Sequence, residues 1–231
     1  MKYMGSKLRI MKDILPIMLK ERKPYQCWVE PFVGGGNSID KVDGWRIGAD
    51  INNYTIESLC SIRDCVNYFP KNNTEFTEED YKHLQNGSLY PYKGYAGFTF
   101  SYGGKWMGGW ARNKTQRDYV REAYNNAKKQ SILLQGVEFI HTSYSDLHIP
   151  SRSLIYNDPP YRNTTNYRNK NTFDSDAFWQ WCREKEREGH TVFVSEYTAP
   201  DDFECVWSKE IWSNLVKNKK GIEKLFRYIG K

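Results

Sequence analysis

The sequence predicts an α/β protein whose sheet domain is built from both ends of the chain, with a second lobe inserted near the middle. Strand-like and helical segments alternate at the start of the chain. This alternation stops after residue 70 and resumes at residue 137. We therefore assign residues 1–55 and 137–231 to the sheet domain, and residues 56–136 to an insertion that is small and mainly helical.

The first part of the chain reads as the opening of a βαβ unit. Helical periodicity and strand-forming composition predict four elements, a helix over residues 6–22, strands over 26–32 and 45–50, and a helix over 55–69. Pro16 interrupts the first helix and predicts a kink or a shorter helix. The first strand runs into Gly34-Gly35-Gly36, which predicts a tight turn followed by a helix, and the second strand ends on Asp50.

The inserted segment carries the basic charge of the chain. Lys93 to Lys129 contains eight basic and two acidic residues, so this window alone accounts for the net charge of +6. Thr77 and Asp80 form a capping box that predicts a short helix. Residues 90–110 are dense in glycine and aromatic side chains, and residues 115–135 predict a basic helix. We expect the lobe to contain a hairpin-like loop as well. A basic insertion in a neutral body is typical of a polyanion-binding surface, although a solvated helix face gives the same charge pattern.

The rest of the chain returns to the α/β pattern. We expect strands over residues 137–142, 154–157 and 191–194, a helix over 174–188, and an antiparallel pair over 203–211 and 225–229.

The composition excludes several classes of protein. No apolar run approaches the roughly 18–20 residues that cross a bilayer, and the first residues lack the apolar stretch of a secretory signal. The five cysteines contain no Cys-x-x-Cys pair, which argues against a disulfide framework or a structural zinc site. The four histidines are scattered, so we expect no metal. A cytoplasmic protein, monomeric by default, is the natural expectation.

The strongest local signal is Asn157-Asp158-Pro159-Pro160-Tyr161, directly after an apolar strand. Two prolines fix the backbone and supply carbonyl groups without N–H donors. Asp158 and the Pro159 carbonyl therefore offer two hydrogen-bond acceptors at the carboxyl edge of a sheet, where α/β proteins bind ligands. An exocyclic amino group fits these acceptors, and Tyr161 can stack on its ring. A proline-rich structural turn is the alternative.

The glycine turn after the first strand is the second signal. Glycines let the backbone approach a ligand closely. The dinucleotide fingerprint would need a third glycine at position 39, which is Ile39. Asp50 stands at the strand end where an acid binds ribose hydroxyls. A nucleoside-containing cofactor without a pyrophosphate satisfies both facts, and a simple tight turn remains the alternative.

Together these segments resemble the Dam-like adenine-N6 DNA methyltransferases with the alpha-type order of motifs. The resemblance rests on Tyr3-Met4-Gly5-Ser6-Lys7, Glu30-Pro31-Phe32-Val33-Gly34-Gly35-Gly36, Asp50 and Asp158-Pro159-Pro160-Tyr161. It implies a Rossmann-like methyltransferase sheet domain, S-adenosylmethionine as cofactor and double-stranded DNA as substrate.

The resemblance also implies roles for individual residues. The cofactor-binding set would be Tyr3, Lys7, Phe32, Gly34, Gly36, Asp50, Asp146 and Asp158, of which Asp146 is the loosest match. The catalytic set would be Asp158, Pro159, Pro160 and Tyr161. The target adenine would leave the duplex, and its N6 would attack the methyl group directly. Glu196, in Ser195-Glu196-Tyr197, stands where the family has a short polar motif.

The insertion is the candidate DNA reader, because Lys and Arg neutralise phosphates and a few side chains can reach base edges. The candidate contacts are Lys105, Arg112, Asn113, Lys114 and Arg117, with a turn role as the alternative for Asn113. Two other functions stay open, methylation of another amine (cytosine N4, RNA adenine or protein glutamine) and a catalytically silent DNA-binding module.

Overall fold

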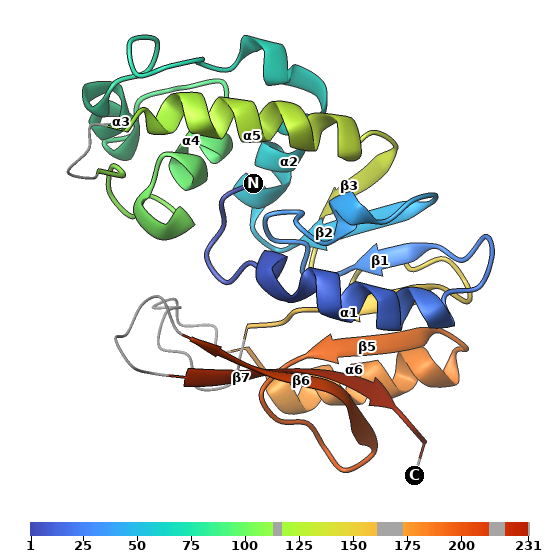
Figure 1. Cartoon of the computed structure of the whole chain (residues 1–231). Coiled ribbons are helices and arrows are strands. Elements are labelled where there is room, and N and C mark those ends of the chain that lie inside the picture. Colours follow the sequence, from blue (N-terminus) through green and yellow to red (C-terminus); the bar gives the residue numbers. More distant parts are fainter. Residues whose placement is uncertain (113–116, 161–172, 213–219, 231) are drawn as a thin grey trace.

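A seven-stranded mixed sheet forms the centre of the protein in this computed structural model, which describes residues 1–112, 117–160, 173–212 and 220–230 (Figure 1). The strand order is β3-β2-β1-β4-β5-β7-β6. The strands are β1 (Trp28–Glu30), β2 (Arg46–Asp50), β3 (Val137–His141), β4 (Leu154–Asn157), β5 (Thr191–Ser195), β6 (Phe203–Trp212) and β7 (Lys220–Tyr228).

The first five strands are parallel, and β7 pairs antiparallel with both β5 and β6. The chain order runs outward in opposite directions from the neighbouring strands β1 and β4, so the topological switch point lies between them. This topology confirms the predicted Rossmann-like α/β class. It also brings the ends of β1 and β4, more than 120 residues apart in the sequence, to the same edge.

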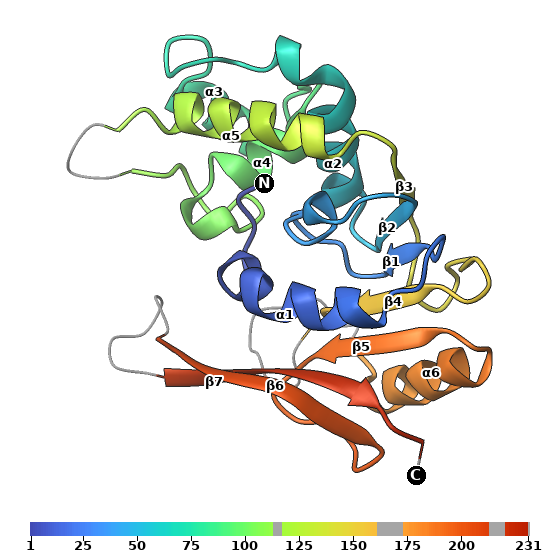
Figure 2. The same ribbon diagram turned by 45° about the vertical axis from the view of Figure 1, so that its right-hand side comes forward.

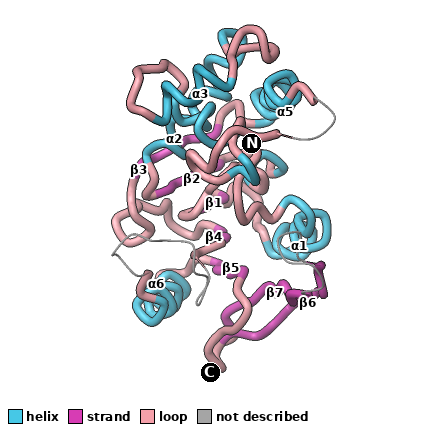
Figure 3. Tube along the Cα trace, turned by 90° about the vertical axis from the view of Figure 1, so that its left-hand side faces the viewer, coloured by secondary structure: helices cyan, strands magenta, loops and turns pink. Residues whose placement is uncertain are grey.

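Helices cover both faces of the sheet. The two faces are seen in Figure 3, with α1 (Leu8–Glu21) on one side and α6 (Ser175–Arg187) on the other. Met11 and Ile14 of α1 pack in the same cluster as Trp28 of β1, whereas Phe178 of α6 packs with Val29. Successive residues of β1 therefore face opposite cores, as the two-residue period of a strand requires. The helix α1 continues through Pro16.

The inserted segment contains helices and short turns. Its elements are α2 (Asn53–Cys65), η2 (Val66–Tyr68), α3 (Glu78–Gln85), α4 (Lys93–Thr99), η3 (Tyr102–Gly104) and α5 (Tyr119–Leu133). The predicted capping box at Thr77 and Asp80 starts α3. The loop after α4 is hairpin-like, because the amide of Tyr102 donates to the carbonyl of Gly109 and an isolated bridge joins Ser101 to Trp110.

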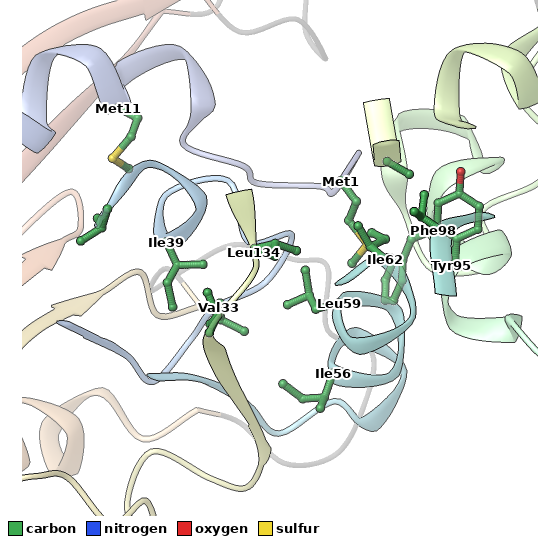
Figure 4. Packing of buried hydrophobic residues seen from close by; sticks show 14 of the residues in the cluster. Met1, Met11, Val33, Ile39, Ile56, Leu59, Ile62, Tyr95, Phe98 and Leu134 are labelled. Carbon is green, nitrogen blue, oxygen red and sulfur yellow. The ribbon is translucent and has the colours of Figure 1, made fainter. Parts of the chain in front are cut away.

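The lobe and the sheet share one hydrophobic cluster. Figure 4 shows Val33 and Ile39 near Leu59 of α2, with Tyr95 and Phe98 of the lobe beyond it. Most aromatic rings of residues 90–110 are buried or partly buried in this cluster, whereas Tyr102 is 67% exposed. The high aromatic content of the insertion thus serves mainly as its core. The domain boundaries at residues 56 and 136 stay a prediction.

One local prediction differs from the structure, and one helix has no counterpart in the sequence pattern. The glycine turn after β1 leads into η1 (Ile39–Lys41), a single 3-10 turn, and not into a full helix. Residues 93–99 form the helix α4, for which the sequence pattern gives no prediction. In α4 the glycines permit close packing, since a Cβ on Gly97 would lie 2.3 Å from the Trp106 ring and one on Gly94 2.5 Å from the Tyr54 carbonyl.

Candidate active site

The carboxyl edge at the switch point holds both principal motifs. The glycine turn follows Glu30 at the end of β1, and Asp158 follows Asn157 at the end of β4. The two strands are neighbours in the parallel part of the sheet. The fold therefore brings the two motifs to one edge, where open α/β sheets bind their ligands.

Asp50 ties the glycine turn to the end of β2. The amide of Gly34 donates to Asp50 Oδ2 at 3.1 Å, and the amide of Asn52 donates to Oδ1 at 2.9 Å. Burial raises the pKa of Asp50 to about 6, against the lowering effect of these two backbone hydrogen bonds. At neutral pH the carboxylate is thus ionised, and each oxygen keeps a further lone pair for another donor.

Tyr3 packs against the glycine turn. Gly34 and Gly36 have φ values of +47° and +65°, a region that favours glycine. A Cβ on Gly34 would lie 3.0 Å from the Tyr3 ring, and one on Gly35 would lie 2.7 Å from the Tyr3 Cβ. A Cβ on Gly36 would lie 2.9 Å from Leu59. Glycine at these positions therefore allows Tyr3 of the N-terminal segment and Leu59 of α2 to pack directly against the backbone of the turn.

The catalytic corner predicted after β4 contains a charged pair. Lys7 Nζ lies 3.2 Å from Asp158 Oδ1 and 3.7 Å from Glu223 Oε2. The Lys7 side chain is 12% exposed and that of Asp158 is 23% exposed. The corner is thus half-buried and not sealed in the interior. Pro159 is buried and Pro160 is partly exposed, while Tyr161 lies outside the described residues.

The pKa of Lys7 reflects opposing effects. Burial alone would lower the pKa of its ammonium group, but the charges of Asp158 and Glu223 and the hydrogen bond to Asp158 raise it above the ordinary value. Lys7 is consequently a permanent cation beside the Asp158 carboxylate. The structure thus brings Lys7 of the N-terminal segment beside Asp158.

A second buried carboxyl group lies at the end of β1. The side chain of Glu30 accepts a hydrogen bond from Trp28 Nε1 at 2.8 Å and one from Ser38 Oγ at 2.7 Å. Burial raises the pKa of Glu30 to about 8, helped by the charges of Asp40 and Asp158. Glu30 therefore carries a proton over much of the neutral range, which limits the negative charge around Asp158.

The remaining cofactor candidates lie on the α6 side and at the end of β3. Phe32 packs among Tyr144, Phe173 and Phe178, with ring centroids 5.4–5.9 Å away. Asp146 is exposed in the turn after β3, where its Oδ2 accepts a hydrogen bond from Ser143 Oγ at 2.6 Å. The structure places both at the carboxyl side of the sheet, and it gives Asp146 a local turn-stabilising partner.

The candidate DNA contacts lie on the lobe surface. Lys105 is exposed in the hairpin-like loop. Arg112 pairs with Glu78 of α3 through two hydrogen bonds, and Arg117 lies 2.8 Å from Glu122 of α5. Asn113 and Lys114 lie outside the described residues. The structure therefore describes three of the five predicted contacts.

Sequence reasoning missed Glu223. It lies on β7, two residues before Leu225, which pairs with Ser195 at the end of β5. Its place beside Lys7 follows from the antiparallel return of β7, and no motif around residue 223 signals it. Tyr197 also belongs to this group, because Glu223 and Asp158 add to the burial that raises the pKa of its phenol.

One family comparison bears on this site. The D12 class N6 adenine-specific DNA methyltransferase model matches residues 3–96. The D12 match confirms the resemblance to Dam-like methyltransferases and covers the N-terminal motif, the glycine turn and Asp50. It ends before Asp158, so the assignment of the catalytic corner rests on the sequence motif and on the geometry described above.

Other comparisons add little to the D12 match. The comparison with curated proteins finds no match. Among solved structures, the chain is similar to SMU.472, assigned as a methyltransferase and complexed with SAH, at 10% identity and a TM-score of 0.39. That match covers 98% of this chain and 53% of the other, so the chain spans about half the length of SMU.472. A similarity at this level says nothing about function.

The residues at the switch point fit a nucleoside cofactor. The ionised Asp50 carboxylate offers acceptors for a vicinal diol, and Phe32 offers an aromatic face at the same edge.

Within the described ranges, no cluster of histidine, cysteine or acidic side chains has a metal-binding arrangement. Among the described helices none is long and apolar enough to span a membrane. All five cysteines are unpaired.

Proposed function

We propose that this protein is a site-specific DNA methyltransferase that transfers a methyl group from S-adenosylmethionine to the N6 atom of adenine. The observation that carries the proposal is the position of Asp158, a partly exposed carboxylate at the topological switch point, on the edge that also holds Asp50 and the glycine turn. The D12 match supports the choice of adenine in DNA.

The cofactor would be held by residues on both sides of the switch point. Asp50 would accept hydrogen bonds from the ribose hydroxyls, and Phe32 would contact the ligand's apolar surface. The proposed cofactor set is completed by Tyr3, Lys7, Gly34, Gly36, Asp146 and Asp158. Bound S-adenosylmethionine supplies an electrophilic methyl group, and the chain's own part is to fix the position of the amine that receives it.

Asp158 and Pro159 would orient the amine. The carboxylate of Asp158 and the Pro159 carbonyl each accept one N6 hydrogen, which directs the nitrogen lone pair out of the ring plane. The prolines add no competing N–H donor. Alignment of the reacting atoms supplies much of the acceleration in such a reaction. Tyr161 would stack on the base.

The adenine would reach this corner by leaving the duplex stack, at a cost of a few kcal/mol. We propose that residues 56–136 form the DNA-reading domain and that residues 1–55 and 137–231 form the catalytic domain. Lys105, Arg112, Lys114 and Arg117 would contact phosphates, and Asn113 would contact a base edge. The hairpin-like loop presents Lys105 and the exposed Tyr102 ring to the solvent.

The decisive experiment combines methyl transfer with base identification. Purified protein is incubated with unmethylated DNA and labelled S-adenosylmethionine, after which the nucleosides are separated by mass spectrometry and the DNA is sequenced for modified positions. We expect label in N6-methyladenine at one short sequence. Label in N4-methylcytosine, or label in RNA or protein alone, would show that the protein methylates a different amine. Saturable DNA binding without any transfer identifies a binding module.

A further inference from the structure

Lys7 lies between two carboxylates that reach it from different parts of the sheet. Asp158 follows β4, and Glu223 belongs to β7. The Lys7 ammonium lies 3.2 Å from Asp158 Oδ1 and 3.7 Å from Glu223 Oε2, and all three side chains are at most 23% exposed. A cation with two partners at similar distances can move from one to the other with little change in total charge pairing.

The course of β7 explains why Glu223 reaches this corner. Leu225 pairs with Ser195, the last residue of β5, and packs in the hydrophobic cluster that contains α1. Glu223 precedes Leu225 by two residues, so it shares that face of the sheet and continues beyond the end of β5. Lys7 directly precedes α1 on the same face.

In the proposed reaction, Lys7 and the substrate amine compete for the carboxylate of Asp158. Asp158 must accept a hydrogen from the substrate amine, whereas its Oδ1 already faces the Lys7 ammonium. A bound cation withdraws negative charge from a carboxylate and weakens it as an acceptor. An alternative anionic partner for Lys7 would release Asp158 to the substrate.

We propose that Glu223 is this partner, a positioning residue that holds Lys7 away from Asp158 while the target amine is bound. This inference rests on the proposed function. No proton or bond is exchanged at Glu223, because it acts only through the position of the Lys7 ammonium. Among the described residues, the groups whose charges act on the pKa of Lys7 are Asp158, Glu223 and Tyr197.

The first test is a double-mutant cycle on the single-turnover rate of methyl transfer. In Glu223→Gln, Lys7 keeps Asp158 as its carboxylate partner, so we expect the rate to fall by about tenfold, within the usual coupling of contacting side chains. The affinities for S-adenosylmethionine and DNA should change by less than about threefold on the same reasoning. In a Lys7→Gln background, the same Glu223→Gln change should alter the rate by less than about twofold, because the ammonium group through which Glu223 acts is absent.

Two further variants control for charge and folding. Glu223→Asp keeps the charge and should restore most of the wild-type rate. Glu204→Gln removes an exposed carboxylate from the neighbouring strand β6 and should leave the rate unchanged. Thermal unfolding of each variant shows whether it is folded, and Glu223→Met, which also removes the charge from a side chain of similar length, replaces E223Q should that variant fail to fold.

A second readout is independent of methyl transfer. The rate at which acetic anhydride modifies Lys7 is measured by mass spectrometry in protein without DNA or cofactor, with the exposed Lys12 of α1 as internal reference. Loss of the Glu223 charge lowers the pKa of Lys7, so the amine should react faster in E223Q than in the wild type.

The outcomes separate the two proposals. Two outcomes in an active wild type overturn only the role of Glu223. One is an unchanged rate in E223Q, and the other is an equal effect of E223Q with Lys7 and with Gln at position 7. Equal acetylation of Lys7 in E223Q and wild type overturns the underlying charge pairing. A wild type that methylates no DNA overturns the proposed function, and the role of Glu223 in catalysis fails with it.

Discussion

The carboxyl edge of the sheet and the surface of the inserted lobe both carry charged side chains, but they hold them differently. At the sheet edge, Lys7 is 12% exposed and lies between carboxylates from two distant segments of the chain. On the lobe, Arg112 is 68% exposed and pairs with Glu78, which is 29% exposed.

The difference in exposure indicates different roles for the lobe ion pairs and for the charges at the sheet edge. Exposed ion pairs contribute little to stability, because water and salt screen them and their side chains lose entropy. Arg112 can therefore exchange Glu78 for a phosphate at little cost. The half-buried charges at the sheet edge are screened less by solvent, so their pairing acts more strongly on a reacting group placed beside them.

Removal of the Asp158 carboxylate is expected to have the largest effect. Asp158→Ala should reduce the single-turnover rate of methyl transfer by about 10³-fold or more, since positioned acceptors and general bases contribute on this scale. Affinity for S-adenosylmethionine, measured by isothermal titration calorimetry, should stay within a few fold. Asp201→Ala, a change at an exposed turn, serves as the control. Normal turnover by D158A would refute the assigned role.

Asp50 should control cofactor affinity. Asp50→Asn removes the charged acceptor and should weaken S-adenosylmethionine binding by about 10- to 100-fold, the range for a hydrogen bond to a charged group. Because the pKa of Asp50 is raised to about 6, the wild-type affinity should fall as the pH drops below that value and the carboxylate is protonated. In D50N this pH dependence should be lost. Parallel pH profiles for the two proteins would contradict the assignment.

Glu30 should make stability depend on pH in the direction opposite to an ordinary salt-bridged acid. Its pKa rises from 4.5 to about 8 in the folded state, so folding takes up a proton between these values. Stability from this group is therefore highest at low pH and declines as the pH rises toward 8. Glu30→Gln should remove up to about 1.4 kcal/mol per pH unit from this slope, measured by urea unfolding between pH 5 and 8. An unchanged slope would show that Glu30 is ionised throughout.

The lobe charges should give the smallest effects. Lys105→Ala should weaken DNA binding a few fold and reduce the salt dependence of log K by about one unit, as expected for one phosphate contact. Glu78→Gln should strengthen DNA binding at low salt, since it frees Arg112 from its partner. Both are measured by fluorescence anisotropy over a range of salt concentrations. A decrease in affinity in E78Q would show that the pair itself is the recognition element.

The sheet was largely predictable from the sequence, because buried parallel strands are short apolar runs that few other elements imitate. Residues 154–157 form β4 as predicted, and the capping box at Thr77 marks the start of α3. The helix α4 was not predicted, because Gly94 and Gly97 weaken a helix locally. These glycines let the helix pack closely against Tyr54 and Trp106, a contact that only the folded structure shows. Tertiary contact overrides local propensity there.

The candidate site was predictable where a motif carries it. Asp50 and Asp158 lie at strand ends, as their positions after apolar runs require. The charged partners were harder to predict: Glu223 joins Lys7 only because β7 returns antiparallel beside β5, and Glu78 joins Arg112 across the lobe. Such pairs depend on the path of the chain in space, which no short window of sequence contains.

The first four residues contact both the inserted lobe and the glycine turn. In Figures 1 and 2 this stretch runs between the lobe helices and α1. The Tyr3 side chain rests on Gly34 and Gly35, while the amide of Met4 donates to the carbonyl of Gly104 at 3.1 Å and Lys2 Nζ donates to that of Ser101 at 3.1 Å. One short segment therefore contacts both the loop that carries Lys105 and the glycine turn, and only two residues separate it from Lys7. Any change in the position of the Lys105 loop would have to be accommodated by residues that also contact the glycine turn.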